Sequence, residues 1–249
     1  MRTEVLERKE DKIKLLLEDT NVKFINALRR TILTEVPTLA VDEVKIYENS
    51  SVLFDEIIAH RLGMVPIETP EEVLENPNLE VEFHLEKEGP KTVYSGDLET
   101  DDPEIKPANS EIPIIKLGEE QKLSLLAKVK LGEGKDHAKW QPGTAYYKEL
   151  EYIVFDCTAD EVDCEEIKEK YSDHDIEETE NELKILVTKR MNVSRELEEY
   201  TTREKIPGSY VLTVESNGEL EVDLMIKQAL KVIRNKTVEF TELLEGLNK

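Results

Sequence analysis

Residues 24–67 read FINALRRTILTEVPTLAVDEVKIYENSSVLFDEIIAHRLGMVPI, and helix and strand signals alternate along them. Apolar residues recur with a helical period over 22–36, which predicts a helix that Pro37 ends. Alternating apolar residues, many of them β-branched, predict a strand over 39–47. A second, short helix is expected over 55–63. This order of elements favours an α+β fold.

Strand signals continue on both sides of this stretch. A hairpin is predicted over 5–17, and strands are predicted over 81–85 and 122–131. Residues 151–200 contain strand and helix signals of their own, which indicates a small separate unit. The segment 135–147 has no clear periodicity, so we expect an ordered loop there.

A turn at Pro207-Gly208 and a strand over 210–214 are predicted, and a long amphipathic helix is predicted to follow from Glu219 almost to the C-terminus. Leaving about six of its large apolar side chains in water would cost on the order of 10 kcal/mol. Such a surface would exceed the ~300–600 Å² patch of a typical monomer. We therefore infer that a partner chain covers part of it, although strands of the same chain could cover it instead. Its apolar positions are Val222, Met225, Ile226, Ala229, Val232, Ile233, Phe240, Leu243, Leu244 and Leu247.

The chain has 249 residues, and 56 Asp and Glu against 33 Lys and Arg give it a formal net charge of −23. So much negative charge repels phosphate, which argues against a free-standing nucleic-acid-binding protein. The sequence has no apolar run long enough to span a membrane and no signal peptide, so a cytoplasmic protein is expected. Glu and Lys dominate the charge, as they do in proteins of thermophiles.

Catalytic motifs are absent from the sequence, which has no phosphate-binding loop, dinucleotide-binding fingerprint, nucleophile elbow or zinc-protease motif. Cys157, Cys164 and His174 match neither the paired spacing of a zinc site nor the four thiolates of an iron–sulfur cluster. We therefore expect no catalytic residue and no metal ligand. In the cytosol the two thiols would be reduced by default, and whether they form a disulfide stays open.

Basic side chains in so acidic a chain are candidates for contacts with another protein. Arg29 and Arg30 lie within the first helix, where they could bind carboxylates bidentately or simply form a solvated face. His60 and Arg61 end the second helix, where a cation favours the helix dipole and could equally contact a neighbouring subunit.

A polar and aromatic cluster, His137, Lys139 and Trp140, lies in the 135–147 segment. A single Trp on a surface loop often marks an interface. The alternative is that its indole fills a local core beneath the loop.

Three motifs, NALRRTILTEVPT, DEIIAHRLGMVPI and GKDHAKWQP, resemble the signature regions of the alpha-like subunits of cellular RNA polymerases. The resemblance covers essentially the whole chain and is closest to the archaeal members, the D-type subunits, which are counterparts of the third-largest subunit of eukaryotic polymerase II and of the N-terminal domain of bacterial alpha. It implies a dimerisation domain formed by both chain ends, 1–40 plus 205–249. It also implies an inserted mainly β domain, 41–150, and a small ferredoxin-like α+β subdomain, 151–204.

The same resemblance implies a role as a non-catalytic assembly platform of DNA-directed RNA polymerase, a nucleotidyltransferase complex. Family members pair with the small alpha-like subunit L and then receive other small subunits and the large catalytic ones, so contact with DNA would be indirect. The residues that it implies for pairing with L are Phe24, Leu28, Ile32, Val222, Met225, Ile226, Ala229, Ile233 and Phe240. The residues expected to face other subunits are Arg29, Arg30, His60, Arg61, His137, Lys139 and Trp140.

Many archaeal relatives hold an iron–sulfur cluster in the ferredoxin-like subdomain, but only Cys157 and Cys164 are available here, so we expect no cofactor. Two other classes of function stay open at this point. One is a redox- or metal-linked regulatory protein that uses these cysteines. The other is a stand-alone enzyme that uses acidic side chains on a cationic substrate.

Overall fold

The computed structural model describes residues 1–76, 79–159, 161–189, 191 and 193–247. Helices and strands are mixed in it, as the sequence predicts. The chain divides into two compact units. The first contains Met1–Arg8, Ile13–Asn26 and Tyr146–Thr213, and the second contains Lys9–Lys12, Ala27–Ala145 and Val214–Lys249.

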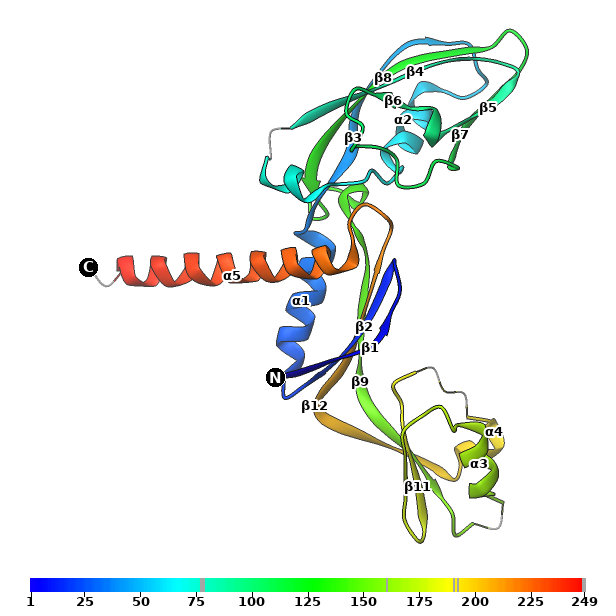
Figure 1. Cartoon of the computed structure of the whole chain (residues 1–249), viewed down its shortest axis with the longest axis vertical. Coiled ribbons are helices and arrows are strands. Elements are labelled where there is room, and N and C mark those ends of the chain that lie inside the picture. The colour runs from blue at the N-terminus through cyan, green and yellow to red at the C-terminus, as the bar shows by residue number, and fades with distance from the viewer. Residues whose placement is uncertain (77–78, 160, 190, 192, 248–249) are drawn as a thin grey trace. The chain divides into compact units, whose positions relative to one another are not determined.

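The first unit is built on a sheet with the strand order β1-β2-β12-β9-β11-β10 (Figure 1). The predicted N-terminal hairpin is confirmed, because β1 and β2 pair antiparallel around a polar turn. Strand β11 pairs antiparallel with both β9 and β10. The bounds are β1 Arg2–Arg8, β2 Lys12–Glu18, β9 Gly143–Asp156, α3 Cys164–Lys170, β10 Ile176–Glu178, β11 Glu182–Leu186, α4 Arg195–Glu198 and β12 Thr201–Ser216.

One end of this sheet has a small hydrophobic core of its own. Phe155, Leu183 and Ile185 are completely buried in it, and all members of the core lie between Ile153 and Tyr200. Helix α3 covers this core and begins where the Asp163 carboxylate accepts two backbone N–H groups. The residues of this small core therefore pack on one another, within a unit that also contains Met1–Arg8 and Ile13–Asn26.

The second unit contains a sheet with the order β3-β8-β4-β6 and a separate pair of strands, β5 and β7. Its core lies between these strands and α2, with Phe83, Ile58 and Leu62 fully buried. Helix α1 begins among residues of the first unit and ends in the second. The bounds are α1 Val22–Thr34, β3 Pro37–Asn49, α2 Asp55–Gly63, β4 Glu80–Glu88, β5 Lys91–Tyr94, β6 Glu99–Thr100, β7 Pro113–Leu117, β8 Lys122–Glu133 and α5 Val222–Leu247. Short 3₁₀ turns occupy Glu71–Glu75 (η1), Ser95–Asp97 (η2) and Ala138–Trp140 (η3).

Two sequence-based expectations are wrong, and both concern the long strands. The segment 135–147 is not entirely a loop, because β9 already begins at Gly143. Pro207 and Gly208 lie inside β12 and form no turn between elements. Gly208 has a positive φ of 75°, which glycine tolerates, and its carbonyl accepts a hydrogen bond from the Thr20 backbone N–H at 3.1 Å. Pairing with neighbouring strands therefore outweighs the local turn signal.

Candidate functional site

Helix α5 has two halves that differ in exposure. Val222, Met225 and Ala229 are buried within the chain. The same face of the helix continues to Phe240 and Leu243, and both of these side chains are 62% exposed. All residues from 234 to 246 are exposed. We call the part of this face that is exposed or half-buried the outer stripe, and it consists of Leu230, Ile233, Phe240, Leu243 and Leu244.

The predicted pairing residues of α1 lie mostly inside the chain. Leu28 and Ile32 are buried, and Phe24 is half-buried. Arg30 is exposed near the end of the helix, where its backbone carbonyl accepts the Thr34 hydroxyl at 2.9 Å. Most of these α1 side chains are therefore out of reach of a partner chain.

A second exposed apolar surface surrounds α2. His60 and Arg61 are both exposed, and the Arg61 guanidinium donates to the Ile114 carbonyl at 2.9 Å. Sequence reasoning missed the apolar side chains beside them. Ile57 lies next to Ile58, which is fully buried, but is itself 46% exposed, and the sequence does not show which of the two faces the core. We call this surface the α2 patch, and it consists of Val52, Phe54, Ile57 and Met64.

The His137–Trp140 cluster is held from within the chain. Lys139 Nζ lies 2.6 Å from Asp42 Oδ1 and 4.3 Å from the centroid of the Trp140 ring. Trp140 is 7% exposed, and its indole N–H donates to the Lys130 carbonyl at 3.2 Å. Burial by itself raises the pKa of Asp42, but the hydrogen bonds and charges of Lys130 and Lys139 hold that pKa below its ordinary value. The indole fills a local core, and exposed His137 is the cluster's most accessible member.

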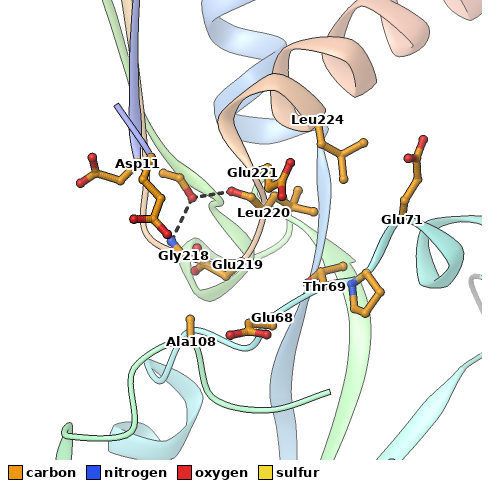
Figure 2. A pocket seen from close by; sticks show the side chains of 13 residues that line it. Asp11, Glu68, Thr69, Glu71, Ala108, Gly218, Glu219, Leu220, Glu221 and Leu224 are labelled. Atoms are coloured by element: carbon orange, nitrogen blue, oxygen red, sulfur yellow. Dashed lines mark hydrogen bonds between the residues drawn. The ribbon is translucent and has the colours of Figure 1, made fainter. Parts of the chain in front are cut away.

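A cavity of about 640 Å³ lies at the turn before α5 (Figure 2). The Glu219 side chain belongs to its lining and is 5% exposed, and Oε2 has no hydrogen-bond partner among the described residues. Burial raises the pKa of Glu219 to about 7, against the opposing effect of hydrogen bonds from its own backbone N–H and from the Asn217 side chain. Periodicity could not single out Glu219, because it looks like an ordinary residue at a helix start. The other carboxylates of the lining are Glu10, Asp11, Glu68, Glu71 and Glu221.

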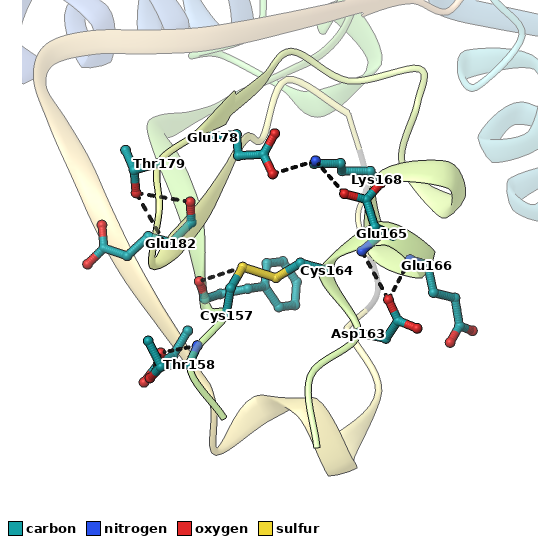
Figure 3. Close-up of a disulfide and its surroundings, with 12 residues drawn as sticks. Cys157, Thr158, Asp163, Cys164, Glu165, Glu166, Lys168, Glu178, Thr179 and Glu182 are labelled. Atoms are coloured by element: carbon teal, nitrogen blue, oxygen red, sulfur yellow. Dashed lines mark hydrogen bonds and ion pairs between the residues drawn. A yellow bond between two sulfur atoms is a disulfide. The ribbon is translucent and has the colours of Figure 1, made fainter. Parts of the chain in front are cut away.

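Cys157 and Cys164 form a disulfide at the start of α3 (Figure 3). The default expectation of reduced thiols is thus wrong for this structure, because the end of β9 and the start of α3 bring the two Cα atoms within 5.9 Å. The chain has no other cysteine. Among the described residues, no group of three His, Cys, Asp or Glu side chains is arranged to hold a metal ion. The donors present therefore do not fit an iron–sulfur cluster, which needs about four thiolates or their substitutes.

In the described part of the chain, no helix is both long and apolar enough to cross a membrane.

Comparisons with known proteins agree on one kind of relative. Residues 44–156 match the protein-family model described as the RNA polymerase Rpb3/RpoA insert domain. The chain is 47% identical to DNA-directed RNA polymerase subunit Rpo3 of Pyrococcus furiosus, with 99% of this chain and 98% of the relative covered. It is 48% identical to the protein of the same name in Thermococcus kodakarensis, over 98% and 97% of the two chains. The Archaeoglobus fulgidus protein of that name is 36% identical, and 98% of each chain is covered.

Proposed function

This chain belongs to the Rpo3 family of DNA-directed RNA polymerase subunits, and we propose that it is a non-catalytic assembly platform that pairs with the smaller alpha-like subunit L. The observation that carries the proposal is the outer stripe of α5. It is continuous with the buried face of the same helix, but the described residues cover its side chains only in part.

Burial of the outer stripe would stabilise a complex appreciably. Leu230, Phe240, Leu243 and Leu244 are between 43% and 62% exposed. Covering the remaining half of four such side chains is worth on the order of 3–6 kcal/mol, at ~1.5–3 kcal/mol for each complete burial. A helix as short as the segment 234–246 is also only marginally stable in water without tertiary contacts. A partner helix would therefore stabilise both the apolar face and the helix itself.

The pairing residues that we favour are those that a partner can reach. Phe240 and Ile233 lie in the outer stripe, and Ile226 lies half-buried at its inner end. Buried residues such as Leu28 of α1 and Met225 of α5 would act indirectly, because they hold their helices in place within the chain. The α2 patch, with His60 and Arg61, offers a second and separate surface for another polymerase subunit.

We also propose that the chain carries no iron–sulfur cluster, because its only two thiols are bonded to each other. A chemical iron assay that finds several atoms per purified chain would overturn this. The redox-linked alternative is not favoured, because the disulfide lies beside the small core of a chain that is related to polymerase subunits throughout its length.

Co-expression with a candidate subunit L tests the pairing. We expect a stable 1:1 complex in size-exclusion chromatography with light scattering. Phe240→Glu should abolish it, because an unpaired charge would be buried. Val238→Glu is the matched control, because Val238 is also exposed on α5 but lies two residues, about 200°, around the helix from Phe240. Equal pairing by the two variants would contradict the assignment of the interface.

A further inference from the structure

The cavity before α5 contains a buried carboxylate oxygen that lacks a partner, and the subunit role does not use it. We propose that this cavity binds an alkyl ammonium group, either the end of a lysine side chain from another polypeptide or a free polyamine. The proposal concerns a site distinct from the outer stripe and does not depend on pairing through α5.

The wall of the cavity is strongly acidic. Six carboxylates line it, and two of them have a lysine partner. Glu68 lies 3.5 Å from Lys106, and Glu71 lies 2.8 Å from Lys227, with both lysine side chains more than half exposed. Within the described part of the chain, the other four carboxylates form no ion pair. The wall therefore carries an excess of negative charge, which attracts a cation.

Glu219 contributes a buried carboxylate to this wall. Its side chain is more than nine-tenths buried, it comes from the turn that forms the cavity wall, and Oε2 accepts no hydrogen bond from any described residue (Figure 2). Buried polar groups normally form a hydrogen bond, so a bound ligand with an N–H donor would supply the one that this oxygen lacks. An ammonium group supplies three N–H donors and a positive charge at one point.

The remaining lining selects an organic cation over a metal ion. Leu220, Leu224, Pro70 and Ala108 contribute apolar surface beside the carboxylates. Methylene groups of a lysine or polyamine chain can pack on such surface while the charged end reaches the acid. The described residues contain no group of three ligands suited to a metal. The volume of about 640 Å³ is in the range of small-molecule sites, ~300–1,000 Å³.

The turn that presents Glu219 is fixed before any ligand arrives. The Glu219 carbonyl accepts the Thr69 backbone N–H at 2.7 Å, and the Gly218 N–H donates to Ser216 Oγ at 2.9 Å. Gly218 has a φ of 106°, and a Cβ atom there would approach the Ala108 Cβ to 2.9 Å. Only glycine meets both conditions without a shift of the neighbouring chain. Such pre-organisation reduces the entropy lost on binding.

Binding should be linked to protonation, because a nearby ammonium favours the charged form of a carboxyl whose pKa is about 7. Affinity should therefore rise from pH 6 to pH 8, and binding at pH 7 should release a fraction of a proton. The other charged groups that line the cavity or pair with its lining are Glu10 and Asp11 of the β1–β2 turn, Glu68 with Lys106, Glu71 with Lys227, and Glu221 at the start of α5.

Isothermal titration calorimetry of the full-length chain with spermidine and with Nα-acetyl-lysine methylamide tests the proposal at ~150 mM salt. Glu219→Gln should weaken binding at least tenfold. Glu72→Gln, which removes the same charge from an exposed residue next to Glu71 but outside the lining, should change it less than twofold. Tighter binding of spermidine would identify a free polyamine as the ligand, and binding of the lysine analogue at least as tight would identify a polypeptide.

Absence of binding by either probe at millimolar concentration would overturn the proposal, and so would equal losses in the two variants. Circular dichroism checks folding. If Glu219→Gln does not fold, Glu221→Gln decides, because Glu221 is exposed and lines the same cavity. An affinity that is unchanged in Glu221→Gln would then reject the site, and a loss of several-fold would support it.

Discussion

Replacement of Glu219 by Gln should make the stability of the second unit less sensitive to pH. The folded pKa of about 7 lies above the ordinary value of 4.5 because burial disfavours the charged carboxylate. Between these two pH values the folded chain retains a proton that the unfolded chain releases. The free energy of unfolding must therefore fall as pH rises through this window, and little further loss is expected well above pH 7.

The magnitude follows from the two pKa values. At ~1.4 kcal/mol per pKa unit, a rise from 4.5 to about 7 corresponds to about 3–4 kcal/mol. Gln resembles the neutral acid and has no charge to bury. At pH 8.5 the Glu219→Gln variant should thus be more stable than the wild type by up to ~3–4 kcal/mol, and near pH 4.5 the difference in stability should be small.

Urea unfolding followed by Trp fluorescence measures this directly. Trp140 is the only Trp and lies in the same unit as Glu219, so its emission reports the unfolding of that unit. The Glu72→Gln variant, changed at an exposed site, should have the same free energy of unfolding as the wild type at every pH. A stability difference between wild type and Glu219→Gln that stayed constant from pH 5 to 8.5 would refute the reasoning, as would a variant less stable than the wild type at pH 8.5.

Three further outcomes are expected. Trp140→Ala should lower the free energy of unfolding by ~3–5 kcal/mol in urea titrations followed by circular dichroism, because its indole is buried; a loss under ~1 kcal/mol would instead indicate an exposed side chain. Cys157→Ser combined with Cys164→Ser should destabilise the 151–200 segment by ~2–3 kcal/mol, since the disulfide closes a loop with a sequence separation of 7; hydrogen exchange should show the loss there, and unchanged protection would contradict it. Phe54→Asp should reduce co-purification of other polymerase subunits without lowering the melting temperature, because Phe54 is 76% exposed; full retention of every subunit would argue against the α2 patch as an interface.

The sequence predicts most elements of this fold where local periodicity is strong. Helix α1 and strand β8 were expected from their apolar spacing and lie within two residues of the predicted limits. Pro207 and Gly208 misled the prediction because a turn signal is local, whereas the continuation of β12 through them depends on strands that are distant in sequence.

The candidate site divides in the same way. The apolar stripe of α5 follows from periodicity, but which half the chain itself covers depends on tertiary packing around Met225 and Ala229. The disulfide could not be predicted because sequence spacing does not fix the distance between Cys157 and Cys164. Glu219 has no sequence signal at all, since its burial results from the meeting of two segments, 68–71 and 216–221.

The anchoring of α5 by its first two turns has a consequence for the amount of this chain that a cell can make without its partner. Val222 and Met225 secure the helix inside this chain, so under the pairing proposed above a copy made before its partner is already folded at the base of the helix. Such an unpaired copy exposes an apolar surface around Phe240 and Leu243. Copies of this chain made in excess of the partner would then aggregate or be degraded. Synthesis of the two polypeptides in equal amounts would prevent unpaired copies of this chain from accumulating.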